Sequence, residues 1–156
     1  MNNNKLNNES RLIIQNQDFS NESSLTQYIK YEALARISFI NCNFKEIDLM
    51  GKVFGKCNFI GCTFNHLNSR KGIISGCHFR DCTITNSDMT RVNFDKSTFI
   101  NCEFINVDLA ASDFCECKLK KTKFLKSNLN FIGLEDVKVW KSKEKEWVEI
   151  DNFFNL

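Results

Sequence analysis

The sequence has no proline, only six glycines and only two histidines among its 156 residues. Proline would delete backbone donors from a β-ladder, so its absence is compatible with a chain built largely of such ladders. The glycines are scattered and form no glycine-rich phosphate loop. His66 and His78 are expected to face outward without a nucleophile beside them. The sequence therefore predicts no catalytic residue, no cofactor and no enzymatic activity.

The sequence also lacks a strong net charge and a long apolar run. Its 21 Lys+Arg and 19 Asp+Glu residues leave a charge of +2, which argues against nucleic acid as a partner. No stretch approaches the roughly 18 apolar residues of a membrane span, and Met1 is followed by no apolar export segment. We therefore expect a cytoplasmic protein whose eight cysteines are reduced thiols rather than a disulfide framework.

Internal repetition dominates what is present. From Ile37 the chain divides into fives (ISFIN, CNFKE, IDLMG and onward) without a slip until Lys141. The third residue of each five is large and apolar in 20 of 21 units, where a 42% hydrophobic composition would give roughly nine. Seven of the eight cysteines lie two residues before such a centre, and Asn or Asp often stands between the two. Strand alternation would turn the cysteine and the centre inward and the polar residue outward.

This pattern resembles the pentapeptide-repeat family, whose motif is a small residue, Asp or Asn, Leu or Phe, and two variable residues. The resemblance implies an all-β solenoid, a right-handed quadrilateral parallel β-helix with four pentapeptides per coil, so residues 37–141 would form about five coils. Positions 20 apart support the four sides independently, because they share chemistry. The predicted core contains three such columns: Phe39, Phe59, Phe79 and Phe99; Phe44, Phe64, Phe104 and Phe124; and Cys42, Cys62, Cys82 and Cys102.

Open solenoid ends expose edges and core, so we expect caps at both ends. Residues 1–10 are polar and are predicted to be a disordered tail. Residues 11–36 are predicted to form an N-terminal cap with a helix at 24–35, which the Ser24/Gln27 spacing would open as a capping box. Phe19 lies 20 residues before Phe39, which leaves open whether residues 11–21 belong to a first coil.

Residues 142–156 are predicted to form a C-terminal cap. Val139/Trp140 and Trp147–Ile150 could pair as a hairpin whose indoles cover the last coil, and Phe153, Phe154 and Leu156 would supply a hydrophobic end. The alternative for this aromatic C-terminus is a homodimer contact.

One stretch breaks the repeat. Lys52 stands where a small inward residue belongs, Ser69 replaces an apolar centre, and Gly72 leaves a gap 20 residues after Lys52. We expect residues 65–72 to bulge from the wall, as a tolerated imperfection or as a functional irregularity.

The eight cysteines are the residues that could provide a metal site or a reactive group. Cys57, Cys62, Cys77 and Cys82 could approach one another inside the coil. Zinc sites normally use gaps of two to four residues, whereas the repeat already explains these spacings, so we predict no metal site and interpret the thiols as small core groups. Cys115 lies outside the pattern, on an expected corner, and is the candidate for an accessible, reactive thiol.

Lysine is concentrated near the C-terminal end of the repeat. The candidate partner surface contains these lysines and three basic residues of the irregular stretch: Lys118, Lys120, Lys121, Lys123, Lys126, His66, Arg70 and Lys71. The lysines could form a solubilising face that protects an edge, or they could contact an acidic protein or a phosphate-bearing partner.

The leading functional hypothesis is a non-enzymatic scaffold that binds an unidentified protein partner through flat outer faces, which offer no deep pocket for a small substrate. The resemblance implies a second hypothesis, since some members of the family modulate DNA gyrase and topoisomerase IV by imitating duplex DNA. That activity would need a strongly negative rod. Residues 37–139 contain 14 Lys/Arg and 11 Asp/Glu, so the charge disfavours it.

Overall fold

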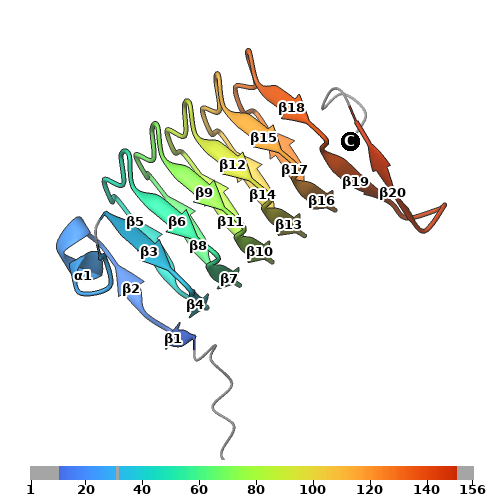
Figure 1. Cartoon of the computed structure of the whole chain (residues 1–156). Helices are drawn as coiled ribbons and strands as arrows, with labels where there is room; N and C mark the ends of the chain where they lie inside the picture. The colour runs from blue at the N-terminus through green and yellow to red at the C-terminus, as the bar shows by residue number, and fades with distance from the viewer. Residues whose placement is uncertain (1–10, 31, 151–156) are drawn as a thin grey trace, which may run out of the picture.

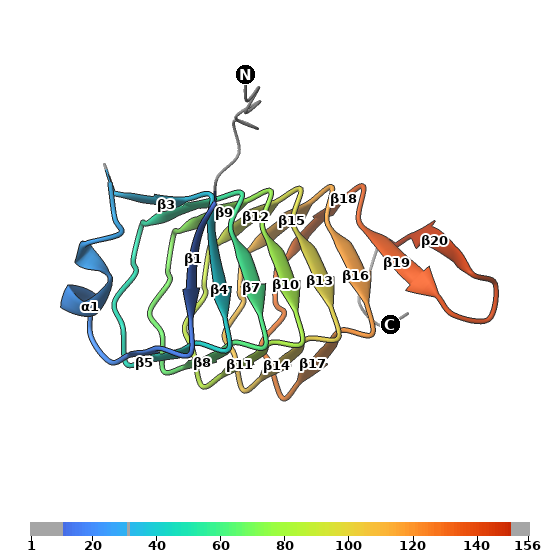
Figure 2. The ribbon, with the colours of Figure 1, turned by 90° about the horizontal axis from the view of Figure 1, so that it is seen from below.

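The computed structural model describes residues 11–30 and 32–150, which form a rod of stacked four-sided coils (Figures 1 and 2). Three walls of the rod are β-sheets, named here sheets A, B and C, and the fourth, wall D, is a row of isolated parallel bridges. The chain is thus a right-handed quadrilateral parallel β-helix of about five coils, as the repeat predicts. No helix among the described residues is long and apolar enough to cross a membrane.

The walls follow one another along the chain in the order A, B, D, C. Sheet A consists of β1 (Leu12–Gln15), β4 (Ile37–Ile40), β7 (Asn58–Ile60), β10 (His78–Arg80), β13 (Thr98–Ile100), β16 (Lys118–Lys120), β19 (Lys138–Lys141) and β20 (Glu146–Glu149). Sheet B consists of β2 (Asp18–Phe19), β5 (Asn43–Lys45), β8 (Thr63–Asn65), β11 (Thr83–Thr85), β14 (Glu103–Ile105) and β17 (Lys123–Leu125). Sheet C consists of β3 (Ala33–Ala35), β6 (Val53–Gly55), β9 (Ile73–Ser75), β12 (Asn93–Asp95), β15 (Asp113–Cys115) and β18 (Gly133–Glu135). Wall D joins Asp48, Asn68, Asp88, Asp108 and Asn128.

The 20-residue register stacks like side chains along the axis. Phe39, Phe59, Phe79 and Phe99 pair in parallel register, and their successive ring centroids are 5.2, 4.7 and 4.9 Å apart. The cysteine column and the other predicted core phenylalanines are buried, except that Phe124 is half-buried in the last coil. This inner column of rings and thiols is the core, and it fixes which side chains face outward.

Each corner uses one residue in the left-handed region. From Arg36 to Asp136 every fifth residue has a positive φ, 21 positions in all, and glycine occupies only three of them. Such a residue turns the chain from one wall onto the next, at a cost that glycine, Asn and Asp reduce. The fifth position of the repeat therefore requires a left-handed backbone conformation. The residue types at this position vary too much for the sequence to indicate that requirement.

The small inward residues connect adjacent coils. The Cys77 thiol donates to the carbonyl of Phe54 at 3.4 Å and accepts the backbone N–H of Cys57 at 3.4 Å. Ser97, 20 residues on, does the same with the carbonyl of Ile74 at 3.0 Å and the N–H of Cys77 at 3.1 Å. These side chains therefore satisfy inward backbone groups as well as filling space.

The N-terminal helix differs from the prediction. It is α1 (Glu22–Thr26), not 24–35, because the Asn21 side chain accepts the Ser24 N–H at 3.0 Å and starts the helix earlier. The residues expected at its end instead form β3, which pairs with β6. The predicted tail at 1–10 lies outside the described residues.

Residues 12–35 form more than a cap. β1 and β2 pair with β4 and β5 as an interrupted first coil. Residues that pair between this first coil and the next are 25 apart in sequence instead of 20. Phe19 therefore stacks on Phe44, and not on Phe39 as the 20-residue spacing predicts. The helical excursion between β2 and β3 accounts for the five extra residues (Figure 2).

The predicted bulge at 65–72 is wrong. Asn68 bridges Asp48 and Asp88 in register with the other coils. Lys52 is accommodated because its side chain leaves the core: its ammonium pairs with Glu32 and lies 3.7 Å from Glu22 of α1. A Cβ on Gly72 would lie 3.0 Å from the Ser69 carbonyl oxygen, so glycine permits this close approach.

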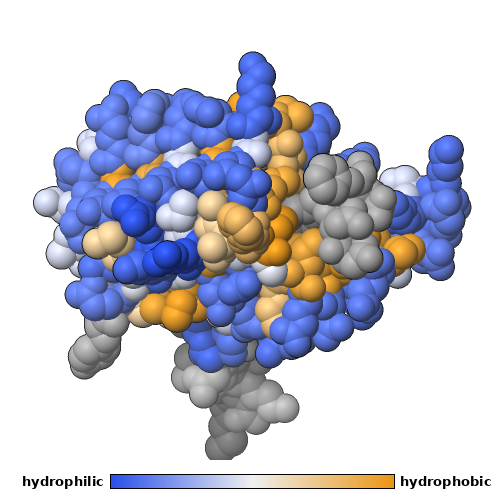
Figure 3. All heavy atoms as spheres, turned by 90° about the horizontal axis from the view of Figure 1, so that it is seen from above, coloured by the Kyte–Doolittle hydropathy of each residue, from blue (hydrophilic) through white to orange (hydrophobic). Residues whose placement is uncertain are grey.

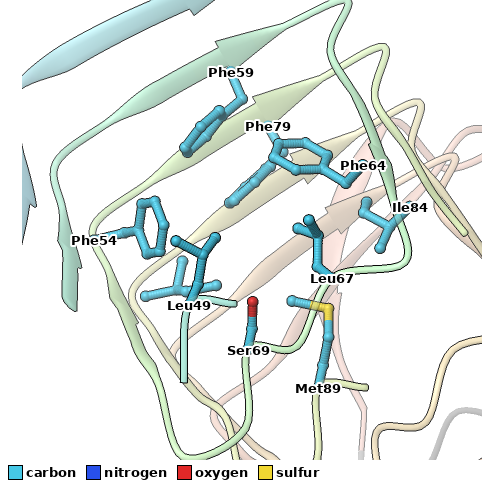
Figure 4. Close-up of a pocket in the computed structure, with 10 residues that line it drawn as sticks. Leu49, Phe54, Phe59, Phe64, Leu67, Ser69, Phe79, Ile84 and Met89 are labelled. Carbon is cyan, nitrogen blue, oxygen red and sulfur yellow. The ribbon is translucent and has the colours of Figure 1, made fainter. Parts of the chain in front are cut away.

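Ser69 leaves a cavity in the core instead. Its side chain is buried, and the space around it, about 30 Å³, is lined by Leu49, Leu67, Met89 and phenylalanines of sheets A, B and C (Figure 4). Within the described part of the chain, its hydroxyl has no hydrogen-bond partner and points into this space (Figure 4). A serine at an apolar centre thus produces a void rather than a bulge.

The C-terminal hairpin is present, but its indoles lie elsewhere than predicted. β19 and β20 pair antiparallel, with Trp140 opposite Trp147. Val139 is the buried residue of β19, so strand alternation turns Trp140 to the outer face of sheet A instead of over the last coil. The other residues proposed for this cap, Phe153, Phe154 and Leu156, lie outside the described residues.

Candidate protein-binding surface

Charge is segregated between the walls of the rod. The strands of sheet A from β1 to β19 contain no Asp or Glu, and they carry Arg80, Lys118, Lys120, Lys138 and Lys141. The strands of sheet C contain no Lys or Arg, and they carry Asp95, Asp113 and Glu135. A net charge of +2 therefore conceals a basic wall next to an acidic one.

Two tryptophans and three lysines meet at the C-terminal end of sheet A, and we call them the lysine–tryptophan platform: Lys118, Lys120, Lys138, Trp140 and Trp147. Lys120 precedes Trp140 by one coil, and its ammonium lies 4.5 Å from the indole centroid. The Lys118 ammonium lies 5.9 Å from the Trp147 ring, and the two indoles meet edge to face at 5.4 Å. Cation–π contacts of this kind keep the ammonium groups close to the sheet.

Within the described part of the chain, the platform lysines form no ion pair with a carboxylate. Among residues 11–30 and 32–150, the ion pairs involve Lys45, Lys52, Arg70, Lys96 and Lys123. None includes Lys118, Lys120, Lys121 or Lys138. Glu149 lies opposite Lys138 in the hairpin register, at the far edge of the platform. The result is a concentrated positive potential on a flat wall.

The structure divides the predicted partner surface. Lys118 and Lys120 lie on the platform, and Lys121 occupies the adjoining left-handed corner. Lys123 lies on sheet B, 3.0 Å from Glu103. The remaining four residues lie near wall D. His66 and Lys126 line a polar groove of about 550 Å³, Arg70 is 3.7 Å from Asp88, and Lys71 is exposed at a corner.

The sequence did contain a signal for the missed members. Lys138 and Trp140 lie 20 residues after Lys118 and Lys120, so the column rule already placed them on one face. The cap interpretation hid this, because it assigned Trp140 to the end of the rod.

Some large apolar side chains are exposed outside the lysine–tryptophan platform. Figure 3 shows a mostly hydrophilic face with its largest apolar area in the C-terminal half. Phe131 is 91% exposed at a left-handed corner, and Leu125 is 42% exposed on β17. These residues add apolar surface near the last coil.

Cys115 is half-buried on β15 rather than exposed at the predicted corner, which Glu116 occupies, and it is poorly suited to reactivity. Its pKa is raised by desolvation and by the carboxylates of Glu135, Glu116 and Asp95, so the thiolate is disfavoured. Ligand atoms of Asp95, Cys115 and Glu116 lie within 4.8 Å of one another, but Lys96 already contacts both of those carboxylates at 3.9 and 3.5 Å. The geometry supports neither a reactive cysteine nor a metal centre.

Comparisons with known proteins agree on the type of repeat. Residues 73–109 match the family model described as pentapeptide repeats, in eight copies. A search of curated proteins finds no match.

Three of the similar solved structures have low sequence identity. Rfr23, a pentapeptide repeat protein from the cyanobacterium Cyanothece 51142, is 14% identical at a TM-score of 0.47 and covers 84% of this chain and 86% of its own. QnrB1, a plasmid-mediated fluoroquinolone resistance protein, is 15% identical at 0.26 and covers 86% and 93%. HetL, a pentapeptide repeat protein involved in heterocyst differentiation regulation from Nostoc sp. strain PCC 7120, is 10% identical at 0.22 and covers 80% and 86%.

The identification rests on the chain's own features together with the family model. The five-residue frame runs from Ile37 to Lys141, the coils stack every 20 residues, and the matched segment lies in the middle of that run. Residues 73–109 therefore consist of pentapeptide repeats, and the same five-residue frame and 20-residue register continue on both sides of that segment.

Proposed function

We propose that the protein is a non-enzymatic scaffold that binds another protein through the lysine–tryptophan platform. The observation that supports this function is a cluster of ammonium groups backed by two indoles on a flat wall, with no carboxylate partner for them among residues 11–30 and 32–150. Tryptophan is enriched among the residues that dominate interface energies. Complementary charge speeds association and selects partners.

A binding role fits the rest of the molecule better than catalysis. The two histidines are exposed and lie on different walls, and the pKa of His78 is lowered by desolvation and by Arg11 and Arg80. Seven of the eight thiols are buried, and all eight are free, which supports a cytoplasmic location. Neither class of side chain provides a nucleophile beside a base.

The alternative, a topoisomerase modulator that imitates DNA, receives less support. Such imitation needs a continuous acidic surface. The carboxylates of sheet C adjoin a basic sheet A, and Lys96 lies between Asp95 and Glu116. A supercoiling assay in which excess protein leaves gyrase unaffected would remove this alternative.

A homodimer through the C-terminus is a separate possibility that the platform does not require. Because Trp140 and Trp147 face outward from sheet A, a dimer that buried them would compete with the proposed partner. Light scattering on the purified protein separates a monomer from a dimer.

Quantitative affinity capture from the native cell tests the proposal. The wild type, a platform variant (Lys118→Glu with Lys120→Glu) and a control of equal charge change on other faces (Lys45→Glu with Arg91→Glu) are compared. We expect one stoichiometric protein with the wild type and the control, and its loss with the platform variant. Equal recovery by all three, or recovery by none, would contradict the proposal.

A further inference from the structure

The platform has a spacing and a chemistry that select one kind of partner segment. Building on the proposed function, we propose that the platform binds an extended acidic peptide segment with Asp or Glu at alternate positions. The inference concerns the partner's chemistry and is independent of the partner's name.

The spacing comes from the sheet. Lys118 and Lys120 lie two residues apart on the outer face of β16, which separates their attachment points by about 6.6 Å. An extended peptide repeats the side chains of one face at the same interval, so carboxylates at positions i and i+2 can each meet one lysine. Lys138 lies on the neighbouring strand opposite Lys118, about 4.8 Å away. It adds charge beside the first carboxylate.

The boundaries of the platform limit the length of the segment. One coil toward the N-terminus, Lys118 and Lys120 are replaced by the neutral Thr98 and Ile100. At the corner, Lys121 extends the positive charge beyond β16. The platform therefore fits two or three carboxylates.

The ring contacts favour anions over stacking ligands. A nucleobase or a sugar would need an open indole face, but the Lys120 ammonium already lies over Trp140 and the Lys118 ammonium over Trp147. The groups presented outward are ammonium heads with an apolar backing. A carboxylate can pair with them without displacing them from the rings.

Titration with short ligands tests this inference. Trp140 and Trp147 are the only tryptophans in the chain, so intrinsic fluorescence reports on the platform. The ligands are a hexapeptide of alternating Glu and Thr, a hexamer of deoxythymidine, and a hexapeptide of the same composition in the order Glu-Glu-Thr-Thr-Glu-Thr. The last is called the block peptide, and no two of its carboxylates lie two residues apart. We expect the alternating peptide to bind at least about fivefold more tightly than the block peptide, with an affinity that weakens as salt rises.

Variants make the result specific. Lys118→Glu with Lys120→Glu should weaken the alternating peptide by about tenfold or more, whereas Lys45→Glu with Arg91→Glu should leave it unchanged. Circular dichroism checks that each variant is folded. Lys118→Gln with Lys120→Gln, which removes the charge but keeps a polar side chain, should also lose binding.

The outcomes separate the two proposals. Equal binding of both peptides, tighter binding of the deoxythymidine hexamer, or binding that survives both platform variants would overturn the inference. If capture of a protein still depended on the platform in that case, the proposed function would stand with a partner of other chemistry. If the capture experiment alone failed, the proposed function would be contradicted, but the preference of the platform for the alternating peptide would still stand.

Discussion

At the scale of single residues, the inward small side chain has a double role. It leaves room for the rings, and it bonds to backbone groups of the coil below, as Cys77 does with Phe54 and Cys57. The repeat predicted that these residues are small and buried. It could not predict the hydrogen bonds, because they depend on the left-handed corner that turns an N–H inward.

Ser69 departs from this rule at an apolar centre, and Ser69→Leu should stabilise the protein. The leucine would occupy the cavity of about 30 Å³ and remove a buried hydroxyl that has no partner in the described chain. We expect a gain of about 1–2 kcal/mol in the free energy of unfolding, measured by urea denaturation. Ser112→Leu is the matched control, because the Ser112 hydroxyl accepts the Val92 N–H at 3.2 Å and donates to the Met89 carbonyl at 2.7 Å. It should destabilise the fold, and equal effects of the two changes would contradict the assignment.

The buried thiols predict alkaline sensitivity. Burial raises the pKa of Cys117 from 9.0 to about 12. Its contribution to stability is fully present below the unfolded pKa and is lost as the pH rises toward the folded value, because the unfolded thiol ionises first. The wild type should therefore lose about 1.4 kcal/mol per pH unit more than Cys117→Ser between pH 9 and 12. Urea midpoints at a series of pH values measure this difference. If the midpoints of the two proteins fell in parallel as the pH rose, burial would not raise the pKa of Cys117 in the folded state.

At the scale of elements, the regular walls were predictable and the interruption was not. The strands of 37–141 follow from period-2 alternation within each five. α1 was misplaced because two residues could open it, and the choice of Asn21 over Ser24 depends on a single side-chain contact. The platform was missed in part for a related reason: the orientation of Trp140 follows from the register of β19, whereas its aromatic character suggested an end cap.

Lys52 should secure the N-terminal element. Its ammonium pairs with Glu22 of α1 and with Glu32, so Lys52→Met removes both contacts while keeping the stem. We expect faster hydrogen exchange in α1 and β3, with no change in β13. The side-chain hydrogen bond to Glu32 raises the pKa of Lys52 above 10.5, so the same loosening should appear in the wild type only as the pH rises past that value. Unchanged exchange in the variant would show that α1 is fixed by Leu25 packing alone.

At the scale of the whole molecule, stability and recognition both follow from the 20-residue coil. No coil can bury its rings alone, so neighbouring coils stabilise one another. The same interval lines up Lys118 with Lys138 and Lys120 with Trp140. Overall composition could not reveal the separation of basic sheet A from acidic sheet C, because the opposite charges nearly cancel in the sum.

Two deletions test the coil most directly. Removing residues 81–100 takes out one complete coil and joins positions of the same register, so we predict a shorter rod that keeps its β-sheet circular dichroism and unfolds cooperatively at a lower temperature. Removing only residues 81–85 shifts every later side chain by one wall, which would place mismatched columns together and prevent folding. If the five-residue deletion folded as well as the 20-residue deletion, the four-sided register would be contradicted.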